Sequence, residues 1–377
     1  MQKKKLLLVG LLLSATLLVL LGLWYRGRNP QTNSKREVRV GVVLPLTGNT
    51  ARYGKWIRNA LELAREEHNA NPSRKYEISF VIEDDAGEAG KAVTATQKLI
   101  TADRVPAIFG TWSSAGVLAM APIIESHKVV LMADAISPRV RTAGDWVFRC
   151  VPDASLSLST LEQPIKGSAF QRLAIVYLNN DFGKDLSDFM TRIIGQGPPA
   201  IVLNEGYTPG TTDFRTLIEK IRSTRPDALF IAGYVEQGTL IRQSKEQGLK
   251  VQIFASPSFE NEDILLQAGN TADGIIFPSY FDTNSEVNIM REFLTKYRGR
   301  YGESAEGFGA SSYAGIKILF EAIERSQSVD SNGIRQSLNS MGNFQSVFGP
   351  TFIDETGDLR YPIFLKTVTN GVFVKKP

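Results

Sequence analysis

From residue 38 onward, apolar runs typical of strands alternate with segments of helical periodicity. The first run, VRVGVVL at 38–44, ends at Pro45, and the segment 54–69 then places apolar residues at i, i+3, i+4 and i+7. The pattern predicts further strands at 76–85, 105–109, 129–133, 173–177, 201–204, 228–232, 252–255 and 274–277. It predicts further helices at 89–101, near 117–124, and at 184–194, 213–223, 236–247, 262–268, 287–301 and 306–326. The tail from Phe344 returns to strand-like runs at 352–353 and 362–368.

Repeated strand–helix units indicate an α/β protein with parallel sheets that helices cover on both faces. About ten strands exceed what one compact open sheet holds well, so we predict two doubly wound lobes. Ligands of such sheets bind beyond the carboxyl ends of the strands, where the following helices begin. Side chains at those ends are therefore the first candidates for a binding site.

The first 25 residues differ from the rest of the chain. MQKKK is followed by an uncharged run from Leu6 to Tyr25, long enough to cross a bilayer. The run ends in Gly-Leu-Trp-Tyr, a poor cleavage site but a suitable interfacial anchor. We interpret residues 1–25 as an uncleaved signal anchor, with a cleaved signal peptide as the alternative, and residues 26–37 as a linker. Either way, the body is exported, and an anchor would hold it at the inner membrane.

Charge and composition exclude several classes of protein. The chain has a net charge of +4, but the first 36 residues carry seven basic and no acidic side chains. The remainder has 36 basic against 39 acidic residues, so it offers no footprint for nucleic acid. One cysteine and two histidines argue against a disulfide and a metal site, and we expect no cofactor. No catalytic motif is present in the sequence. The carboxylate pair Asp84-Asp85 is expected to be solvated, so we do not expect an enzyme.

The corner GTWSSAG, residues 110–116, follows the strand at 105–109. Ser113 or Ser114 is a favoured helix N-cap, and the free N–H groups of a helix start attract a carboxylate. The serine hydroxyls would bind the same group, and Trp112 would stack on the solute. The alternative is a capped helix with a tryptophan in the core.

Other strand ends carry further candidates, each with a plain structural alternative. Tyr53 stands at the start of the first helix, in a Gly-containing loop that lacks phosphate-binding spacing. Asp134 follows the strand at 129–133, where it would pair with a cationic solute or cap a turn. Phe182 and Tyr234 follow strands of the second half and would form aromatic walls facing the first lobe.

The order and spacing of several motifs resemble one family. They are VRVGVVLPLTGNTARYG, FGTWSSAG, VVLMADAISPRV, VFRCVPDAS, LAIVYLNNDFGKD, DALFIAGYVEQGTLIRQSKEQGL and FIDETGDLRYP. Together they resemble the branched-chain amino-acid and amide/urea-binding family of periplasmic solute receptors that feed ABC transporters. The resemblance covers the chain from about Val38 to its C-terminus.

The resemblance implies the periplasmic binding protein type I fold, with two lobes joined by three hinge crossings and the solute between them. It implies a first lobe at 38–153 plus 281–343 and a second lobe at 154–280 plus 344–377. It assigns the carboxylate or amide end of the solute to Ser113, Ser114, Ala135 and Ser137. It places Tyr53, Phe182 and Tyr234 where relatives have aromatic contacts, and the Trp-Ser corner is more similar to the amide and urea branch.

Two departures from the family pattern concern an amino-acid ligand. Ile136 stands where amino-acid binders usually have Thr, and Pro257 stands where they carry the acid for the ammonium group. Ser258 and Glu260 lie near that place, and Asp134 is a substitute from the opposite wall.

The resemblance predicts a monomeric receptor with permease subunits as its partners. The solute is then an amino acid, amide, urea or related carboxylate, enclosed by hinge closure. A ligand-sensing module that signals to a partner is the main alternative, and an α/β enzyme is the other.

Overall fold

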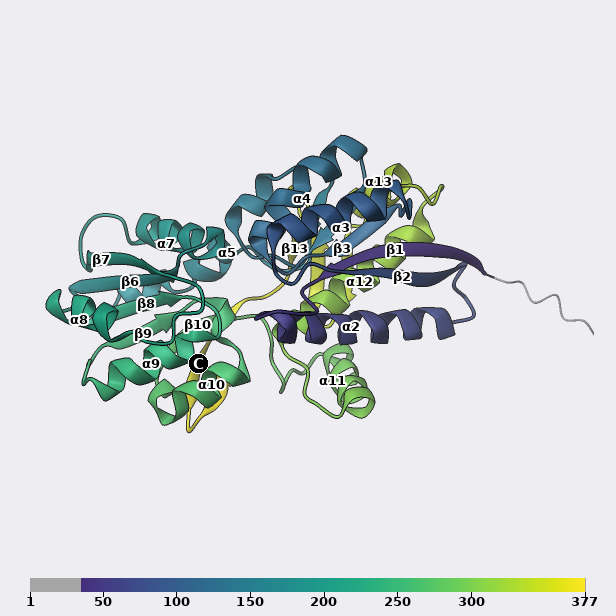
Figure 1. Cartoon of the computed structure of the whole chain (residues 1–377). Helices are drawn as coiled ribbons and strands as arrows, with labels where there is room; N and C mark the ends of the chain where they lie inside the picture. The colour runs from purple at the N-terminus through teal and green to yellow at the C-terminus, as the bar shows by residue number, and fades with distance from the viewer. Residues whose placement is uncertain (1–34, 377) are drawn as a thin grey trace, which may run out of the picture. The chain divides into compact units, whose positions relative to one another are not determined.

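The computed structural model describes residues 35–376, so the predicted anchor at residues 6–25 lies outside the described residues. Within 35–376, no helix is both long enough and apolar enough to cross a membrane. The body, residues 37–377, forms one compact unit of the chain. Its two large sheets belong to two lobes (Figure 1).

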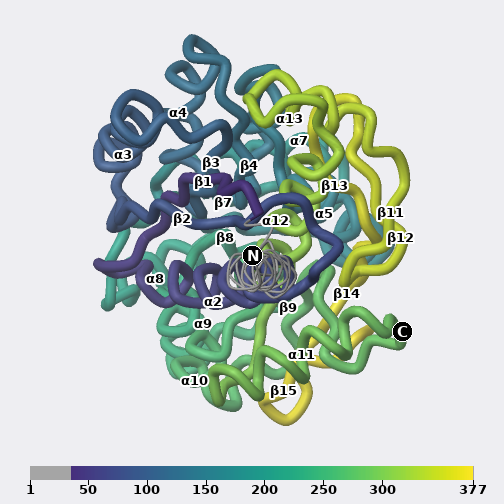
Figure 2. Tube along the Cα trace, turned by 90° about the vertical axis from the view of Figure 1, so that its right-hand side faces the viewer, coloured from purple at the N-terminus to yellow at the C-terminus, as the bar shows by residue number. Residues whose placement is uncertain are grey.

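The first sheet has the order β2-β1-β3-β4-β5, and the pairs β1–β3, β3–β4 and β4–β5 are parallel. Its strands are β1 (Arg36–Leu44), β2 (Tyr76–Asp84), β3 (Ala107–Gly110), β4 (Val130–Ala133) and β5 (Val147–Arg149). The helices around it are α2 (Ala51–Ala70), α3 (Ala89–Thr101), α4 (Ser114–His127), α11 (Asn288–Tyr301), α12 (Gly307–Arg325) and α13 (Ser331–Asn339). Helices α3 and α4 cover one face, and α2 and α12 cover the other (Figures 1 and 2).

The second sheet has the order β15-β14-β10-β9-β8-β6-β7. Its strands are β6 (Arg172–Leu178), β7 (Ala200–Tyr207), β8 (Ala228–Ala232), β9 (Gln252–Ala255), β10 (Ile276–Ser279), β14 (Phe364–Thr369) and β15 (Val372–Lys375). The last two pair antiparallel, whereas β6 to β10 are parallel to their neighbours in this part of the sheet. The accompanying helices are α5 (Ala154–Ser159), α6 (Glu162–Lys166), α7 (Asp181–Ile194), α8 (Arg215–Ser223), α9 (Glu236–Glu246) and α10 (Glu262–Ala268).

The chain passes between the two sheets three times, after β5, after β10 and after β13. A small third sheet precedes the last crossing and consists of β11 (Asn343–Ser346), β12 (Gly349–Ile353) and β13 (Leu359–Arg360). Three short 3-10 turns complete the fold: η1 (Pro138–Thr142), η2 (Pro257–Phe259) and η3 (Gly269–Ala272). Of the third sheet, the sequence pattern predicted only the end of β12, at 352–353. It did not predict β5, β15 or helices α5, α6 and α13.

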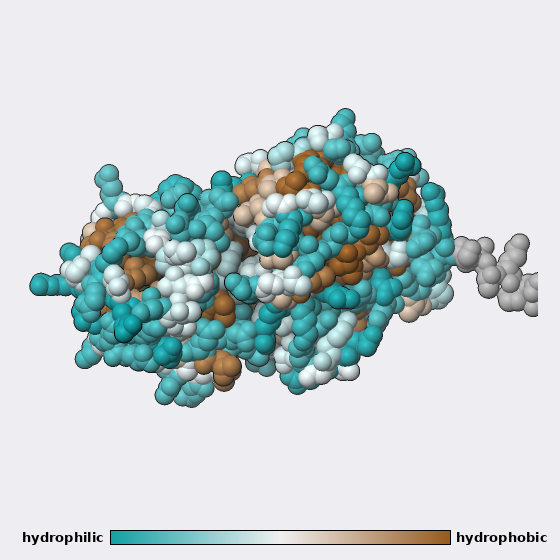
Figure 3. Space-filling view, viewed as in Figure 1, coloured by the Kyte–Doolittle hydropathy of each residue, from teal (hydrophilic) through white to brown (hydrophobic). Residues whose placement is uncertain are grey.

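The apolar runs of the sequence become strands that are buried on both faces. Along β8, Ala228, Phe230 and Ala232 face the larger hydrophobic core, while Leu229 and Ile231 face a second, smaller core. A strand covered by helices on both sides carries no polar alternation, which explains the continuous run ALFIA. Polar residues cover most of the face seen in Figure 3.

One sequence interpretation is corrected by this packing. Asp85 was expected to be solvated, but it is completely buried and accepts hydrogen bonds from Thr111 Oγ1 and Gly87 N. Asp84 accepts from the backbone N–H groups of Leu46 and Thr47. The pair therefore ties the loops at the carboxyl ends of β1, β2 and β3 together, close to the GTWSSAG corner.

Candidate functional site

The GTWSSAG corner joins β3 to α4 as predicted. Ser113 is the N-cap of α4, and its side-chain oxygen accepts a hydrogen bond from Gly116 N at 3.3 Å. The first backbone N–H groups of a helix have no partner within the helix, so those of Ser114 and Ala115 remain for another acceptor. The start of α4 is therefore suited to an anion at the carboxyl edge of the first sheet.

Two glycines allow the tight geometry of this corner. A Cβ on Gly110, whose φ is +120°, would lie 2.0 Å from the carbonyl oxygen of Val43. A Cβ on Gly116 would lie 2.6 Å from Thr111 Cγ2. Side chains cannot be accommodated at these distances. Gly116 thus permits packing within the corner itself, and it brings the start of α4 against the end of β3.

The loop after β4 packs against the same corner. Ser137 N donates a hydrogen bond to Ser114 Oγ at 3.3 Å, and Ala135 and Ile136 are buried beside it. The hydroxyl of Ser137 donates to Asp185 of α7, in the other lobe. The resemblance assigned Ser114, Ala135 and Ser137 to the solute, and the structure brings these three residues together at the start of α4.

Five aromatic side chains meet at the junction of the two lobes, and we call them the aromatic cluster: Tyr53, Trp112, Phe182, Tyr234 and Phe308. The rings of Tyr53 and Trp112 stack with centroids 4.1 Å apart. Trp112 lies 4.8 Å from Tyr234, which in turn stacks on Phe182 at 4.9 Å. Phe308, at the start of α12, makes edge contacts with Tyr53 and Trp112 at 5.7 Å.

The aromatic cluster links two independent parts of the fold. Tyr53, Trp112 and Phe308 come from helices and loops around the first sheet, whereas Phe182 and Tyr234 come from the second. Burial raises the pKa of the Tyr53 and Tyr234 hydroxyls far above the usual range, so both remain neutral donors at any physiological pH. The cluster lies directly beside the N-cap of α4, because Trp112 immediately precedes Ser113.

Asp134 is bound to α12. Its carboxylate is fully buried, Oδ2 accepts from Ser312 Oγ, and Oδ1 has no hydrogen-bond partner among residues 35–376. Burial raises its pKa to about 7, and the Ser312 hydrogen bond offsets only part of that effect. Cys150 and Tyr280 stand at the start of two of the three crossings. Burial is the main reason that their pKa values are raised, and the negative charge of Asp134 is the second reason.

Glu260 is already engaged within its own lobe. It accepts hydrogen bonds from Lys366 Nζ and Ser279 Oγ. Burial raises its pKa, and Lys366 offsets part of the increase. The nearby hydroxyl of Ser258 donates to the carbonyl of Gly233 at 2.7 Å. The second lobe therefore offers no uncommitted carboxylate at the place where amino-acid binders carry one.

A buried ion network joins the first and third crossings, and sequence reasoning missed it. Arg149 donates to both carboxylate oxygens of Asp358, at 2.8 and 2.5 Å, and its Nη2 lies 3.8 Å from Asp153. Arg360 binds Asp354 at 2.6 Å and lies 3.6 Å from Asp153. Because the partners are far apart in sequence, only the fold reveals the network.

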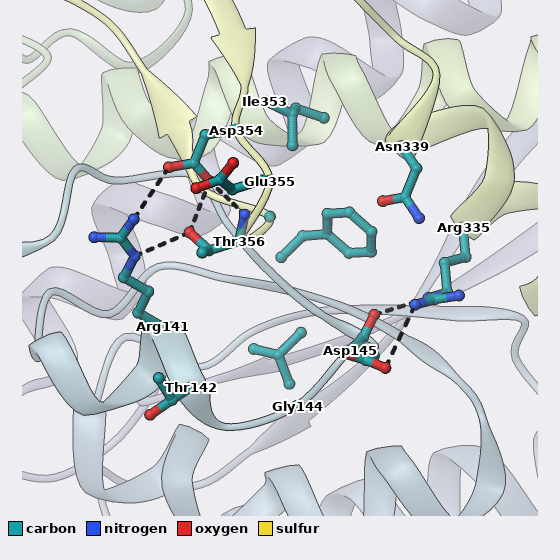
Figure 4. A pocket seen from close by; sticks show the side chains of 13 residues that line it. Arg141, Thr142, Gly144, Asp145, Arg335, Asn339, Ile353, Asp354, Glu355 and Thr356 are labelled. Atoms are coloured by element: carbon teal, nitrogen blue, oxygen red, sulfur yellow. Dashed lines mark hydrogen bonds and ion pairs between the residues drawn. The ribbon is translucent and has the colours of Figure 1, made fainter.

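A separate polar pocket of about 420 Å³ lies beside this network (Figure 4). Arg141 faces Asp354 and Thr356 across it, and Arg335 faces Asp145. Four of its five charged side chains form the pairs Arg141–Asp354 and Arg335–Asp145, and its lining includes one aromatic ring, that of Phe148. This pocket therefore differs in chemistry from the aromatic cluster. Among residues 35–376, no group of three or more His, Cys, Asp or Glu side chains is placed to hold a metal ion.

Comparison with known sequences identifies the family of this fold. Residues 37–371 match the family described as periplasmic binding protein. The Leu/Ile/Val-binding protein homolog 3 of Brucella melitensis is 25% identical over 334 residues, which cover 87% of this chain and 90% of that protein.

Solved structures show the same architecture. The leucine-binding protein LivK of Thermotoga maritima matches with a TM-score of 0.84 at 25% identity, over 90% of this chain and 98% of that one. LivJ of Streptococcus pneumoniae, solved with isoleucine, matches with a TM-score of 0.82 at 24% identity, over 90% and 100% of the two chains. A Rhodopseudomonas palustris solute-binding protein, solved with 3,4-dihydroxybenzoic acid, matches with a TM-score of 0.80 at 23% identity, over 88% and 93%.

Proposed function

The chain belongs to the periplasmic binding protein family and is a solute-binding protein of ABC transporters, and we propose that its solute is a small carboxylate with an apolar or aromatic body. The family consists of binding proteins, not enzymes. The observation that carries the proposal is the position of the aromatic cluster, which spans both lobes directly beside the capped start of α4. The solute lies between the lobes, and its carboxylate binds at Ser113 and Ser114.

The carboxylate end follows from the local chemistry of the first lobe. The N–H groups at the start of α4 and the positive end of its dipole favour a negative group. The hydroxyls of Ser113 and Ser114 stand at this point, and the backbone at Ala135 to Ser137 packs against them. Among residues 35–376, no acidic side chain is a hydrogen-bond partner of the Ser113 or Ser114 hydroxyl.

The body of the solute is accommodated by the aromatic cluster. Trp112 and Tyr53 supply rings from the first lobe, and Tyr234 and Phe182 supply rings from the second. Ring–ring contacts of this kind contribute about 1 kcal/mol beyond the burial of area. An apolar or aromatic body inserted among these rings would contact both lobes at once, and only such a ligand can favour the closed form.

The place where amino-acid binders carry an acid gives an α-amino group no free carboxylate. Glu260 is held by Lys366 and Ser279, and Ile136 provides no hydroxyl. Asp134 is buried behind Ser312. Leucine, the solute named for the Thermotoga relative, is the second candidate, because it shares the carboxylate and the apolar body.

Calorimetry with matched solutes tests the proposal. Leucine is compared with 4-methylpentanoate, and phenylalanine with 3-phenylpropanoate, because the members of each pair differ only in the α-amino group. We expect the acids to bind at least as tightly as the amino acids. Tighter binding of leucine or phenylalanine by tenfold or more would show that the site recognises an ammonium group. Failure of all four to bind would reject the solute class.

The N-terminal segment and the lobe boundaries complete the proposal. Residues 6–25 anchor the receptor to the inner membrane, and the solute passes to permease subunits from a monomer. The uncharged run and its Trp-Tyr end support the anchor. The lobes comprise 38–153 plus 281–343 and 154–280 plus 344–377. The mass of the receptor recovered from membranes tests the anchor, since a cleaved signal peptide would remove these residues.

A further inference from the structure

Four side chains form a polar contact from one lobe to the other, and we call them the clasp: Ser137, Arg139, Asp181 and Asp185. Ser137 and Arg139 belong to the loop after β4 and to η1, beside the first sheet. Asp181 and Asp185 lie one helical turn apart on α7, beside the second sheet. Arg139 Nη2 donates to Asp181 Oδ1 at 2.6 Å, and Arg139 Nε donates to Asp185 at 3.0 Å.

Asp185 is the centre of the clasp. The Ser137 hydroxyl and the Arg139 guanidinium both donate to the same carboxylate oxygen, Oδ2. The Asp185 side chain is only 12% exposed, whereas Arg139 and Asp181 are about half exposed. Charge-assisted hydrogen bonds to a shielded carboxylate are among the stronger polar contacts in proteins. The loop that carries Ser137 also carries Ala135 and packs on the start of α4, so the clasp holds the candidate solute site from the opposite lobe.

Two further contacts join α2 to the second lobe. Asn261 Nδ2 donates to the Tyr53 hydroxyl at 3.0 Å, and Arg52 Nε lies 3.1 Å from Asp263. Two sets of polar contacts therefore join the lobes in addition to the aromatic cluster. One set joins η1 and the loop before it to α7, and the other joins α2 to the start of α10. All of these contacts are made between protein groups, so they exist whichever solute is bound.

We propose that Asp185 is a positioning residue that sets the affinity of the receptor by stabilising the closed arrangement of the lobes through Ser137 and Arg139. The inference rests on the proposed function, in which the solute binds between the lobes. A solute that binds only the closed form shows an apparent Kd equal to its intrinsic Kd divided by the closed fraction. Contacts that raise the closed fraction therefore improve the affinity for every solute by the same factor. In this role the Ser137 hydroxyl serves the clasp and not the solute.

The experiment compares the full-length protein with its Asp185→Ala, Arg139→Ala and doubly substituted forms. Each single change is expected to weaken binding of 4-methylpentanoate and 3-phenylpropanoate equally, by about fivefold, as for a partly exposed ion pair of about 1 kcal/mol. The double change should cost less than the sum of the single changes, because both variants lose the Arg139–Asp185 contact, while each also loses one contact of its own, Ser137–Asp185 or Arg139–Asp181. Arg215→Ala is the matched control, since Arg215 pairs with Asp213 inside one lobe.

A second measurement needs no solute. Spin labels on Gln97→Cys in α3 and Thr216→Cys in α8 report the distance between the lobes, and the native Cys150 is buried and will not be labelled. Without solute, Asp185→Ala should increase the fraction of molecules with the longer distance between the labels. Raising NaCl from about 0.1 M to about 1 M should have the same effect on the protein whose clasp residues are intact.

The outcomes separate the two proposals. Unchanged distances in Asp185→Ala and Arg139→Ala would overturn the clasp, even if solutes bind as proposed. A loss of affinity for one solute only would also overturn it, because it would show that Asp185 contacts that solute. If no solute binds the unsubstituted protein, the solute class fails, while the distance measurement still decides the clasp. Thermal unfolding of each variant confirms that a loss of binding does not reflect a loss of fold.

Discussion

The indole of Trp112 stacks on the ring of Tyr53 with an interplanar angle of 12° and is at the same time in contact with Tyr234 of the other lobe. One side chain thus connects the corner after β3, the start of α2 and the loop after β8. This relationship places the first turn of α4 within reach of groups from both lobes.

Replacing Ser113 with Ala should weaken solute binding by about tenfold, since it removes one hydroxyl from the carboxylate. It also removes the N-cap of α4 and should cost about 1 kcal/mol in the free energy of unfolding. Asp330→Ala is the matched control, because Asp330 caps α13 by accepting from Gly333 N at 2.9 Å. Calorimetry and urea unfolding should show lost stability in both variants and lost affinity only in Ser113→Ala. Equal affinities would remove Ser113 from the site.

Replacing Tyr53 with Phe should keep the aromatic stack and remove the hydrogen bond from Asn261. Because that bond joins the lobes, solute affinity should fall by about fivefold, equivalent to about 1 kcal/mol. Tyr301→Phe provides the comparison, since the Tyr301 hydroxyl donates to Asn59 O within the first lobe. Tyr301→Phe should lower the free energy of unfolding and leave the Kd for the solute unchanged. If both variants lost affinity equally, the hydrogen bond between the lobes would have no special role in binding.

Replacing Arg149 with Ala should destabilise the protein strongly. It leaves the buried Asp358 without its principal cation, and breaking such a pair typically costs about 3–5 kcal/mol. Lys220→Ala, which breaks an exposed pair with Glu205, should change stability by less than about 1 kcal/mol. Urea unfolding measures both. Similar midpoints for the two variants would show that the network at the crossings contributes little.

The stability should fall as pH rises from about 4 to about 7, partly because of Asp134. Its folded pKa of about 7 exceeds the ordinary value of 3.8, so in this window the unfolded chain loses a proton that the folded protein retains. Glu306, whose pKa burial raises to about 8, acts in the same direction. Asp134→Asn should remove several kcal/mol of this dependence, at about 1.4 kcal/mol per pKa unit. Urea unfolding at pH 5 and pH 8 tests this. An unchanged slope would show that Asp134 titrates normally.

Periodicity predicted most of the strands and helices correctly, because most strands of the two large sheets are buried on both faces or followed by an amphipathic helix. The Ser113 cap was predictable for a similar reason: serine at a strand–helix corner is a local signal. The positions of Phe182 and Tyr234 at strand ends predicted that they face the first lobe, whereas the direct contact of Tyr234 with Trp112 was not predicted.

Other parts of the site have no local signal. Phe308 looks like any apolar position of a helix, and Asn261 and Asp185 look like ordinary polar surface residues until the lobes are placed together. Arg149 and Asp358 are 209 positions apart. Asp85 appeared solvated because its neighbours in sequence are charged, yet the ends of three strands enclose it. The contacts of these residues are set by the tertiary structure, and composition and residue spacing do not predict them.

The larger hydrophobic core contains side chains from both lobes, including Phe182, Phe230 and Phe254 together with Phe109 and Phe148. The two halves of the molecule therefore share much of their interior, although the second lobe also has the smaller core of its own. Heating should accordingly melt them together in a single calorimetric transition, and a substitution deep in one half should lower the melting temperature of the whole body.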